Sequence, residues 1–222
     1  MRIDVRESVL NRNEALAAEN RRVFHRDGVR VLNVLSSPGS GKTALLERTL
    51  CELRGEMRMA VVVGDLATEN DAMRLRRSGA PAVQITTGDI CHLEAQMVAR
   101  ACEQLDLAAI DLLFIENVGN LVCPCSYDLG EDFRVVLLSV TEGEDKPLKY
   151  PTMFKSADVV VLTKTDIAEA VGFDRASALD AIHRIAPQAT VLEISSRSGA
   201  GMDAWYDALR RSCAAQMWGA RT

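Results

Sequence analysis

The segment from residue 36 to residue 43, SSPGSGKT, has the residue types that hold the phosphates of a nucleotide. It lies between an apolar run (29–35) and a helical pattern (42–54), and it matches the P-loop pattern GxxxxGK[ST] except that Ser36 replaces the first glycine. Glycine lets successive backbone N–H groups turn toward phosphate oxygens, lysine neutralises the β and γ oxygens, and a threonine hydroxyl ligates Mg²⁺. We therefore predict a nucleotide and magnesium site formed by Ser37, Gly39, Ser40, Gly41, Lys42 and Thr43.

Selection of the base is predicted at the end of a later apolar run (157–163), which finishes in the tetrapeptide TKTD. This tetrapeptide resembles the NKxD element of GTPases, with threonine in place of asparagine. In that arrangement Asp166 accepts hydrogen bonds from N1 and N2 of guanine, a pattern that adenine does not offer, and the stem of Lys164 covers the base. Ser195 lies in a downstream segment that resembles the loop cradling the base. The predicted nucleotide is therefore GTP.

Carboxylates close two other apolar runs. Asp65 follows the run 59–64, where it could hold Mg²⁺ or orient a water molecule. The tetrapeptide ENVG (116–119) resembles the DxxG element of GTPases, so that Glu116 would meet magnesium through water and Gly119 would donate its backbone N–H to the γ-phosphate. Acidic residues at strand ends also serve as helix caps, and it is the P-loop that favours catalysis here. We predict Lys42, Asp65, Glu116 and Gly119 as the catalytic residues.

Cysteine and histidine gather at two places beside these motifs. Cys91 and His92 open a predicted helix (92–105), a position that lowers the pKa of a thiol, and Cys123-Pro124-Cys125 follows the ENVG tetrapeptide. Two sulfurs and one imidazole suit Zn²⁺ or Ni²⁺. Water, Cys125 or a second subunit would supply the fourth ligand, and burial of the cysteines without a metal is the competing interpretation. Packing roles are predicted for Cys51, Cys102 and Cys213.

These motifs need a scaffold that brings distant segments to one edge. Continuous apolar strands separated by helices are typical of parallel sheets covered on both faces. We therefore predict an α/β fold, a doubly wound and mostly parallel sheet of about seven strands, as one domain over 1–222 with an N-terminal helix at about 8–26. Ligands of such folds bind beyond the carboxyl ends of the strands, where every motif falls. The apolar runs are 29–35, 59–64, 81–86, 111–116, 133–140, 157–163 and 189–195, and the helical patterns after the first helix are 42–54, 69–78, 92–105, 151–156, 173–186 and 201–216.

Composition narrows the class of protein further. The 26 Lys and Arg residues against 31 Asp and Glu residues give a formal charge of −5, which argues against coating nucleic acid or an anionic membrane. No apolar run approaches the ~18 residues of a membrane span, and the first residues contain no apolar core of a signal peptide. Six scattered cysteines do not form a secreted disulfide framework. The cytoplasm is the expected location.

Six motifs occur in an order that resembles the HypB family, the nickel-incorporation GTPases of [NiFe]-hydrogenase maturation. They are SSPGSGKT, GDLATENDA, TGDICHLEAQM, FIENVGNLVCP, SVTEGEDKPLKYP and TKTD, and the resemblance runs from about residue 9 to the C-terminus. It implies the P-loop GTPase fold of the SIMIBI class, slow hydrolysis of GTP, and a homodimer with nucleotide at its interface. It also implies delivery of Ni²⁺ toward the hydrogenase large subunit with a HypA-type zinc protein, and it maps the family's metal site onto Cys91, His92 and Cys123.

The chain departs from this family in several positions. No cysteine precedes Cys51 and the three histidines lie far apart, so the sequence has neither the CxxCGC segment nor the His-rich tract of some members, and nickel storage is not expected. Thr163 replaces asparagine in the base-binding motif, and Cys125 stands where a small residue is expected.

Three further classes of protein compete with this interpretation. A urease-type nickel GTPase (UreG-like) would carry Cys-Pro-His where this chain has Cys123-Pro124-Cys125. A nucleotide kinase would bind adenine, which the TKTD tetrapeptide disfavours. A metal-binding dimer could use GTP only structurally, and measured turnover of GTP would separate it from an enzyme.

Lysine usage singles out one further loop. The chain has 21 Arg and only five Lys residues, so a retained Lys suggests a site that needs a compact ammonium group. Lys146 and Lys149 follow the run 133–140 at the edge where the other motifs lie. We predict that both serve the nucleotide across the dimer. The competing interpretation is a solvated loop in which acidic neighbours balance the two lysines.

Overall fold

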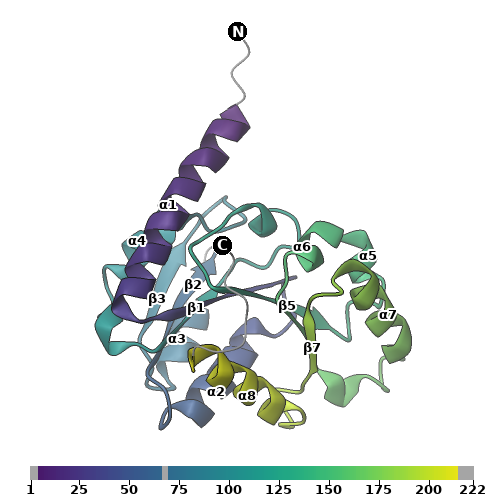
Figure 1. Ribbon diagram of the computed structural model, residues 1–222. Helices are drawn as coiled ribbons and strands as arrows, with labels where there is room; N and C mark the ends of the chain where they lie inside the picture. Colours follow the sequence, from purple (N-terminus) through teal and green to yellow (C-terminus); the bar gives the residue numbers. More distant parts are fainter. Residues whose placement is uncertain (1–4, 67–69, 215–222) are drawn as a thin grey trace.

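Seven parallel strands form the centre of the molecule, in the order β3-β2-β4-β1-β5-β6-β7 (Figure 1). The computed structural model describes residues 5–66 and 70–214, with side chains from residue 9 onward. The strands are β1 (Arg30–Ser36), β2 (Met59–Asp65), β3 (Ala82–Thr86), β4 (Leu112–Glu116), β5 (Phe133–Ser139), β6 (Val159–Thr163) and β7 (Thr190–Glu193). All of their pairings are parallel, so their carboxyl ends meet at one edge.

Helices cover both faces of the sheet (Figure 1). Apolar side chains from three helices join those of the strands on one face, namely α2 (Lys42–Leu53), α3 (Asn70–Arg76) and α8 (Met202–Cys213). Side chains from α1 (Val5–Asp27), α4 (Ala95–Cys102), α6 (Pro151–Lys155) and α7 (Arg175–Ile185) pack on the other face. A four-residue helix, α5 (Lys146–Lys149), contacts α6 and α7. Short 3₁₀ helices span Leu107–Ala109, Pro124–Ser126 and Thr165–Ile167.

Alternation along the central strand explains how both faces are buried. On β1, Leu32 and Val34 belong to the apolar cluster under α2 and α8, whereas Val31 and Leu35 belong to the clusters on the opposite face. Successive side chains of a strand point to opposite faces, so a strand buried on both sides must be apolar throughout. Asn33 breaks that run while being 0 % exposed.

The helix α1 packs on the body of the molecule from about Asn13 onward, and its N-terminal end extends away from it (Figure 1). Phe24 and Ala17 are buried at 2 % and 0 % exposure. Asn13 and Asn20 attach the helix to the beginning of α4: Ala95 N donates to Asn13 Oδ1 (2.8 Å), and Asn20 Nδ2 donates to Ala95 O (2.9 Å). No helix within the described residues has the length and apolar character needed to cross a bilayer.

The predicted sheet is confirmed, since each strand lies within two residues of its apolar run. The helical patterns also correspond to helices, although residue 69 of the pattern 69–78 and residues 215 and 216 of the last pattern lie outside the described residues. Two predictions are wrong. Cys91 and His92 do not open a helix, because α4 begins at Ala95 and Glu94 before it is extended (φ −114°, ψ 155°). Cys51 does not pack, because it is exposed on the surface of α2.

Candidate nucleotide and metal sites

The P-loop lies between β1 and α2, and its conformation depends on two glycines. Gly39 and Gly41 have φ angles of +75° and +100°, in the left-handed region that favours glycine. Lys42 begins α2 and is only 7 % exposed, and its Nζ donates to Ser36 Oγ at 3.0 Å. The serine that replaces the first glycine of the motif is therefore a hydrogen-bond partner of the P-loop lysine.

Two elements outside the P-loop hold its backbone and hydroxyls in place. Ser37 Oγ and Ser40 Oγ each donate to the Glu142 carboxylate at 2.6 Å. Thr163 Oγ1 donates to Ser40 O at 2.7 Å. Thr163, the departure from the asparagine of the base motif, thus connects the end of β6 directly to the P-loop.

A buried carboxylate faces the start of α2. Glu116 is 3 % exposed, Thr43 Oγ1 donates to its Oε1 at 2.7 Å, and its Oε2 has no hydrogen-bond partner among the described residues. Burial raises the pKa of Glu116 to about 7, although the nearby Lys42 ammonium opposes that rise. Burial likewise lowers the pKa of Lys42. An unpaired buried oxygen beside a threonine hydroxyl fits a divalent cation, which prefers oxygen ligands.

The P-loop and Glu116 line one cavity of about 430 Å³ at the carboxyl edge of the sheet. Asp71 and Arg74 of α3 also line it; Asp71 lies within the GDLATENDA motif, but the sequence analysis assigns no role to either residue. Asp71 acts at a distance by raising the pKa of Glu116. The predicted residues that the cavity brings together are Gly39, Gly41, Lys42, Thr43, Asp65, Glu116 and Gly119.

The predicted base-binding residues meet beside the P-loop. Lys164 has a φ of +60°, which L-residues rarely adopt, and its Nζ donates to Gly39 O at 2.7 Å. Ser195 Oγ donates to Asp166 Oδ1 at 2.6 Å, and Thr165 N donates to Ile194 O at 3.2 Å. The two loops predicted to hold the base are therefore joined, with the Asp166 carboxylate exposed at their junction.

A second site lies beside the first. The ligand atoms of Cys91, His92 and Cys123 all lie within 4.8 Å of one another, and all three side chains are half-buried. The His92 ring stacks on Tyr127 with centroids 3.9 Å apart and an interplanar angle of 25°. Both ring nitrogens of His92 are buried without a hydrogen-bond partner in the described part of the chain, since Glu94 Oε1 is 3.7 Å from Nε2. Two thiols and an unpaired imidazole at this spacing fit Zn²⁺ or Ni²⁺.

Protons and a metal ion compete for the ligand atoms of this site. Burial lowers the pKa of His92, so the imidazole is held in the neutral form that ligates a metal. A hydrogen bond with the Cys91 thiol, together with burial, raises the pKa of Cys123. Neither shift follows from a helix terminus, the position that the sequence suggested. A metal ion binding here must displace protons from the thiols.

Three other predicted residues do not join their sites within this chain. The Cys125 thiol lies outside the three-ligand set and donates to Val122 O at 2.9 Å. Lys149 pairs with Asp145 at 2.6 Å, and Lys146 Nζ lies 5.3 Å from the centroid of the Tyr150 ring. Lys149 lines a cavity of about 540 Å³ that is also lined by His92 and Cys123.

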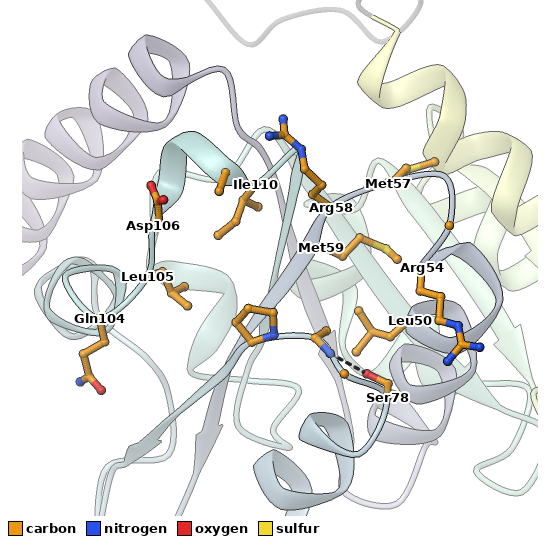
Figure 2. A pocket seen from close by; sticks show the side chains of 15 residues that line it. Leu50, Arg54, Met57, Arg58, Met59, Ser78, Gln104, Leu105, Asp106 and Ile110 are labelled. Atoms are coloured by element: carbon orange, nitrogen blue, oxygen red, sulfur yellow. Dashed lines mark hydrogen bonds between the residues drawn. The ribbon is translucent and has the colours of Figure 1, made fainter.

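A larger cavity, of about 720 Å³, opens at the opposite edge of the sheet, near the amino ends of β2 and β3 (Figure 2). Its lining is mostly apolar, including Leu50, Met59 and Ile110, with Arg54 and Asp106 at its rim (Figure 2). None of the motif residues lines it. Size alone would misplace the site, because the phosphate-binding and ligating groups are all at the carboxyl edge.

The fold and the carboxyl edge together define a P-loop nucleotide-binding protein. A family model described as CobW/HypB/UreG, nucleotide-binding domain, matches residues 30–193. The hydrogenase maturation factor HypB of Rhizobium leguminosarum bv. viciae is 51% identical over 212 residues, which covers 96% of this chain and 71% of the relative. The chain therefore belongs to the HypB branch of the CobW/HypB/UreG family, as its motifs suggested.

Two solved structures agree with this assignment. HypB from Helicobacter pylori in complex with nickel superposes with a TM-score of 0.89 at 41% identity, covering 95% of this chain and 99% of that one. HypB from Archaeoglobus fulgidus gives a TM-score of 0.86 at 40% identity, covering 91% of this chain and 99% of the other. The predicted P-loop GTPase fold is thereby confirmed.

Proposed function

We propose that this protein is a GTP-hydrolysing metallochaperone that assists nickel insertion into [NiFe]-hydrogenase. The observation that carries the proposal is the convergence of Cys91, His92 and Cys123 within 4.8 Å, beside a P-loop. Cys123 follows the 116–119 segment after four residues, so one loop belongs to both sites. The relative from Rhizobium leguminosarum is named a hydrogenase maturation factor, and the Helicobacter pylori structure is a nickel complex.

The nucleotide is GTP, held with magnesium. Lys42 and the P-loop N–H groups face the phosphates, and Asp166 with Lys164 receives the guanine. Thr43, and Glu116 through water, would hold Mg²⁺ with Asp65 nearby, and the ion would supply positive charge beside the phosphates. The unpaired Oε2 of Glu116 supports that cation site.

Hydrolysis is slow and depends on positioning. Lys42 neutralises oxygen charge, Asp65 or Glu116 orients the attacking water, and Gly119 N–H donates to the γ-phosphate. A close approach supports the role of Gly119: a Cβ at that position would lie 2.8 Å from Pro38 Cα, so this residue lies directly against the P-loop. We expect the GTP-bound form to dimerise, with a HypA-type zinc protein and the hydrogenase large subunit as partners in the cytoplasm.

The test is a set of measurements on the pure protein with GDP and with a non-hydrolysable GTP analogue. We expect larger particles by size-exclusion chromatography with the analogue, one Ni²⁺ or Zn²⁺ per chain, and measurable release of phosphate from GTP. Competition should rank GTP above ATP, and Asp166→Asn should shift the preference toward xanthosine triphosphate, whose C2 oxygen accepts a hydrogen bond from the new amide. Preference for ATP would contradict the GTPase assignment.

Two competing functions give different results in the same measurements. A dimer that uses GTP only structurally would bind GTP and metal but release no phosphate. A urease-type nickel GTPase would restore nickel insertion in a urease maturation assay and leave hydrogenase inactive. Restoration of hydrogenase activity in a strain that lacks its own nickel-insertion GTPase supports the proposal.

A further inference from the structure

A row of buried carboxamides lies between the two sites. Asn33 on β1 and Asn117 after β4 are 0 % and 1 % exposed. A carboxamide buried among apolar side chains destabilises the fold unless its donors and acceptors are paired. Here they are paired with one another, with backbone N–H groups and with the Glu131 carboxylate, to which Asn33 Nδ2 donates at 3.4 Å, so their positions are tightly defined.

Asn117 joins three segments of the molecule with one side chain. Its Oδ1 accepts hydrogen bonds from Leu93 N at 3.2 Å and from Val118 N at 2.9 Å. Its Nδ2 donates to Asn33 Oδ1 at 3.3 Å. The P-loop strand, the 116–119 segment and the segment that carries Cys91 and His92 therefore meet at this amide.

Asn120, on the same loop as Asn117, also fixes the backbone next to His92. Asn120 Nδ2 donates to Cys91 O at 3.3 Å, and its Oδ1 accepts from Val122 N at 2.8 Å. The peptide groups on either side of His92 are thus fixed by Asn117 and Asn120. Cys123 lies on the same loop three residues further on.

Close packing leaves little room for these segments to move separately. A Cβ at Gly119 would lie 2.8 Å from Pro38 Cα, and a Cβ at Gly64 would lie 2.8 Å from the Leu93 side chain. A shift of the 117–120 backbone toward or away from the P-loop therefore moves the acceptor of Leu93 N and the donor to Cys91 O together. The shift is thereby transmitted to the two peptide groups that flank His92.

We propose that Asn117 is the positioning residue through which the nucleotide state sets the geometry of the Cys91, His92 and Cys123 ligand set. This inference rests on the proposed function, because it needs both a nucleotide and a metal ion to bind. Its physical content is a single buried acceptor shared by the phosphate-side loop and the ligand-bearing loop. Coupling of this kind is a free energy between two sites, and it is reciprocal.

The experiment measures the dissociation constant of Ni²⁺, by competition with a chromophoric chelator, once with GDP and once with a non-hydrolysable GTP analogue. The ratio of the two constants reports the coupling alone, and in the unaltered protein we expect it to differ from one by roughly fivefold or more. Asn117→Leu removes the acceptor for Leu93 N at similar size, and the ratio should fall to about one. Asn117→Asp loses the donor to Asn33 Oδ1 but retains the acceptor for Leu93 N, and because the proposal assigns the coupling to that acceptor, it should keep the ratio.

A matched control separates coupling from simple support of the loop. Asn20 Nδ2 donates to Ala95 O at 2.9 Å and to Leu129 O at 3.0 Å, so it holds the same ligand-bearing region through bonds that do not involve the 116–120 loop. Asn20→Leu should change both dissociation constants by the same factor and leave their ratio intact. Asn120→Ala, a change at a half-buried position, provides a second test should Asn117→Leu not fold, and it should reduce the ratio.

The outcomes distinguish this inference from the proposed function. An unchanged ratio in folded Asn117→Leu overturns the role of Asn117. If that variant does not fold, an unchanged ratio in Asn120→Ala has the same meaning. Neither result contradicts nickel binding or GTP turnover. A ratio of one in the unaltered protein overturns the inference together with the proposed coupling. A ratio that also falls to about one in Asn20→Leu would show general loosening of the loop and would overturn the role of Asn117. Reduced effect of Ni²⁺ on GTP-analogue affinity in Asn117→Leu supports it.

Discussion

The nucleotide site and the ligand set of Cys91, His92 and Cys123 share one edge of the sheet but are built differently. The nucleotide site has two buried ionisable groups, Lys42 and Glu116, which come from the start of a helix and the end of a strand. The ligand set is half-buried and comes from two loops. Regular elements position the first site, whereas hydrogen bonds from asparagine side chains position the second.

That difference indicates how each site responds to change. Removing one buried charge leaves its partner unpaired in an apolar environment, which is costly for binding and for folding. Removing one ligand from a half-buried loop lowers metal affinity but leaves the core untouched. The nucleotide site is therefore expected to be rigid, and the ligand set to be adjustable.

The largest effect is expected for Lys42→Ala. The P-loop loses the cation that faces the β and γ phosphates, and hydrolysis of GTP should fall by about 100-fold or more, with most of the nucleotide affinity. Steady-state phosphate release and equilibrium nucleotide binding measure the two losses. Lys155→Ala, which removes an exposed lysine of α6, is the matched control and should behave as the unaltered protein. Turnover at the original rate in Lys42→Ala would show that this site does not hydrolyse nucleotides.

The next effect is on stability, through Glu116. Its pKa rises from 4.5 to about 7 on folding, so between these pH values the folded chain holds a proton that the unfolded chain has released. The free energy of unfolding should therefore fall by about 3 kcal/mol as the pH rises through that window, without magnesium or nucleotide. Glu116→Gln should remove most of this pH dependence.

Urea denaturation at several pH values across the window, with a chelator present, measures the Glu116 effect. Glu169→Gln, at an exposed position, is the control and should retain the slope of the unaltered protein. An identical slope in Glu116→Gln and Glu169→Gln would mean that Glu116 does not hold its proton at neutral pH.

The nucleotide site could be predicted from the sequence because its motifs are local. SSPGSGKT, ENVG and TKTD each place a side chain directly after a strand, and parallel strands bring their ends together without further information. Asp71 and Glu142 lie in the motifs GDLATENDA and SVTEGEDKPLKYP, but those motifs do not show what either carboxylate contacts. Glu142 comes soon after β5, and only the fold shows that its carboxylate meets Ser37 and Ser40.

The positioning of the ligand set could not be predicted, because it depends on contacts between distant residues. Asn117 and Asn33 meet because β1 and β4 are neighbours in a particular register, with Asn33 opposite Ile115. The late start of α4 has the same cause: Leu93 N donates to Asn117, and Ala95 N donates to Asn13 of α1. These tertiary bonds satisfy N–H groups that the first turn of a helix leaves without an intrahelical acceptor, and they hold the segment before α4 outside the helix.

A smaller effect is expected at the ligand set, where the three residues should act as one unit. Replacing a residue that only supports a metal ligand typically costs 10–100-fold in affinity, so alanine at Cys91, His92 or Cys123 should cost at least about tenfold for Ni²⁺. The losses should not add in double variants, because the residues share one ion. Cys51→Ala, at the exposed cysteine of α2, is the control. Unchanged stoichiometry and affinity in Cys123→Ala would exclude this ligand set.

The smallest effect is expected for Lys146 and Lys149. If they reach a nucleotide, the nucleotide site is not built by regular elements of one chain alone. Within their own chain they contact Tyr150 and Asp145 in the described part of the structure. A contribution to hydrolysis would therefore have to come from a second copy of the chain, whose lysine adds charge stabilisation only in the dimer. An exposed ammonium contributes little, so we expect a decrease of a few-fold in GTP hydrolysis for Lys146→Ala or Lys149→Ala.

The decrease should appear only at protein concentrations where dimers form, which distinguishes a contact across the dimer from a defect within one chain. Phosphate release per site, measured at rising protein concentration beside size-exclusion chromatography, tests this, with Lys155→Ala again as the control. Equal turnover and equal dimerisation in both variants at every concentration would mean that the two lysines only balance their acidic neighbours.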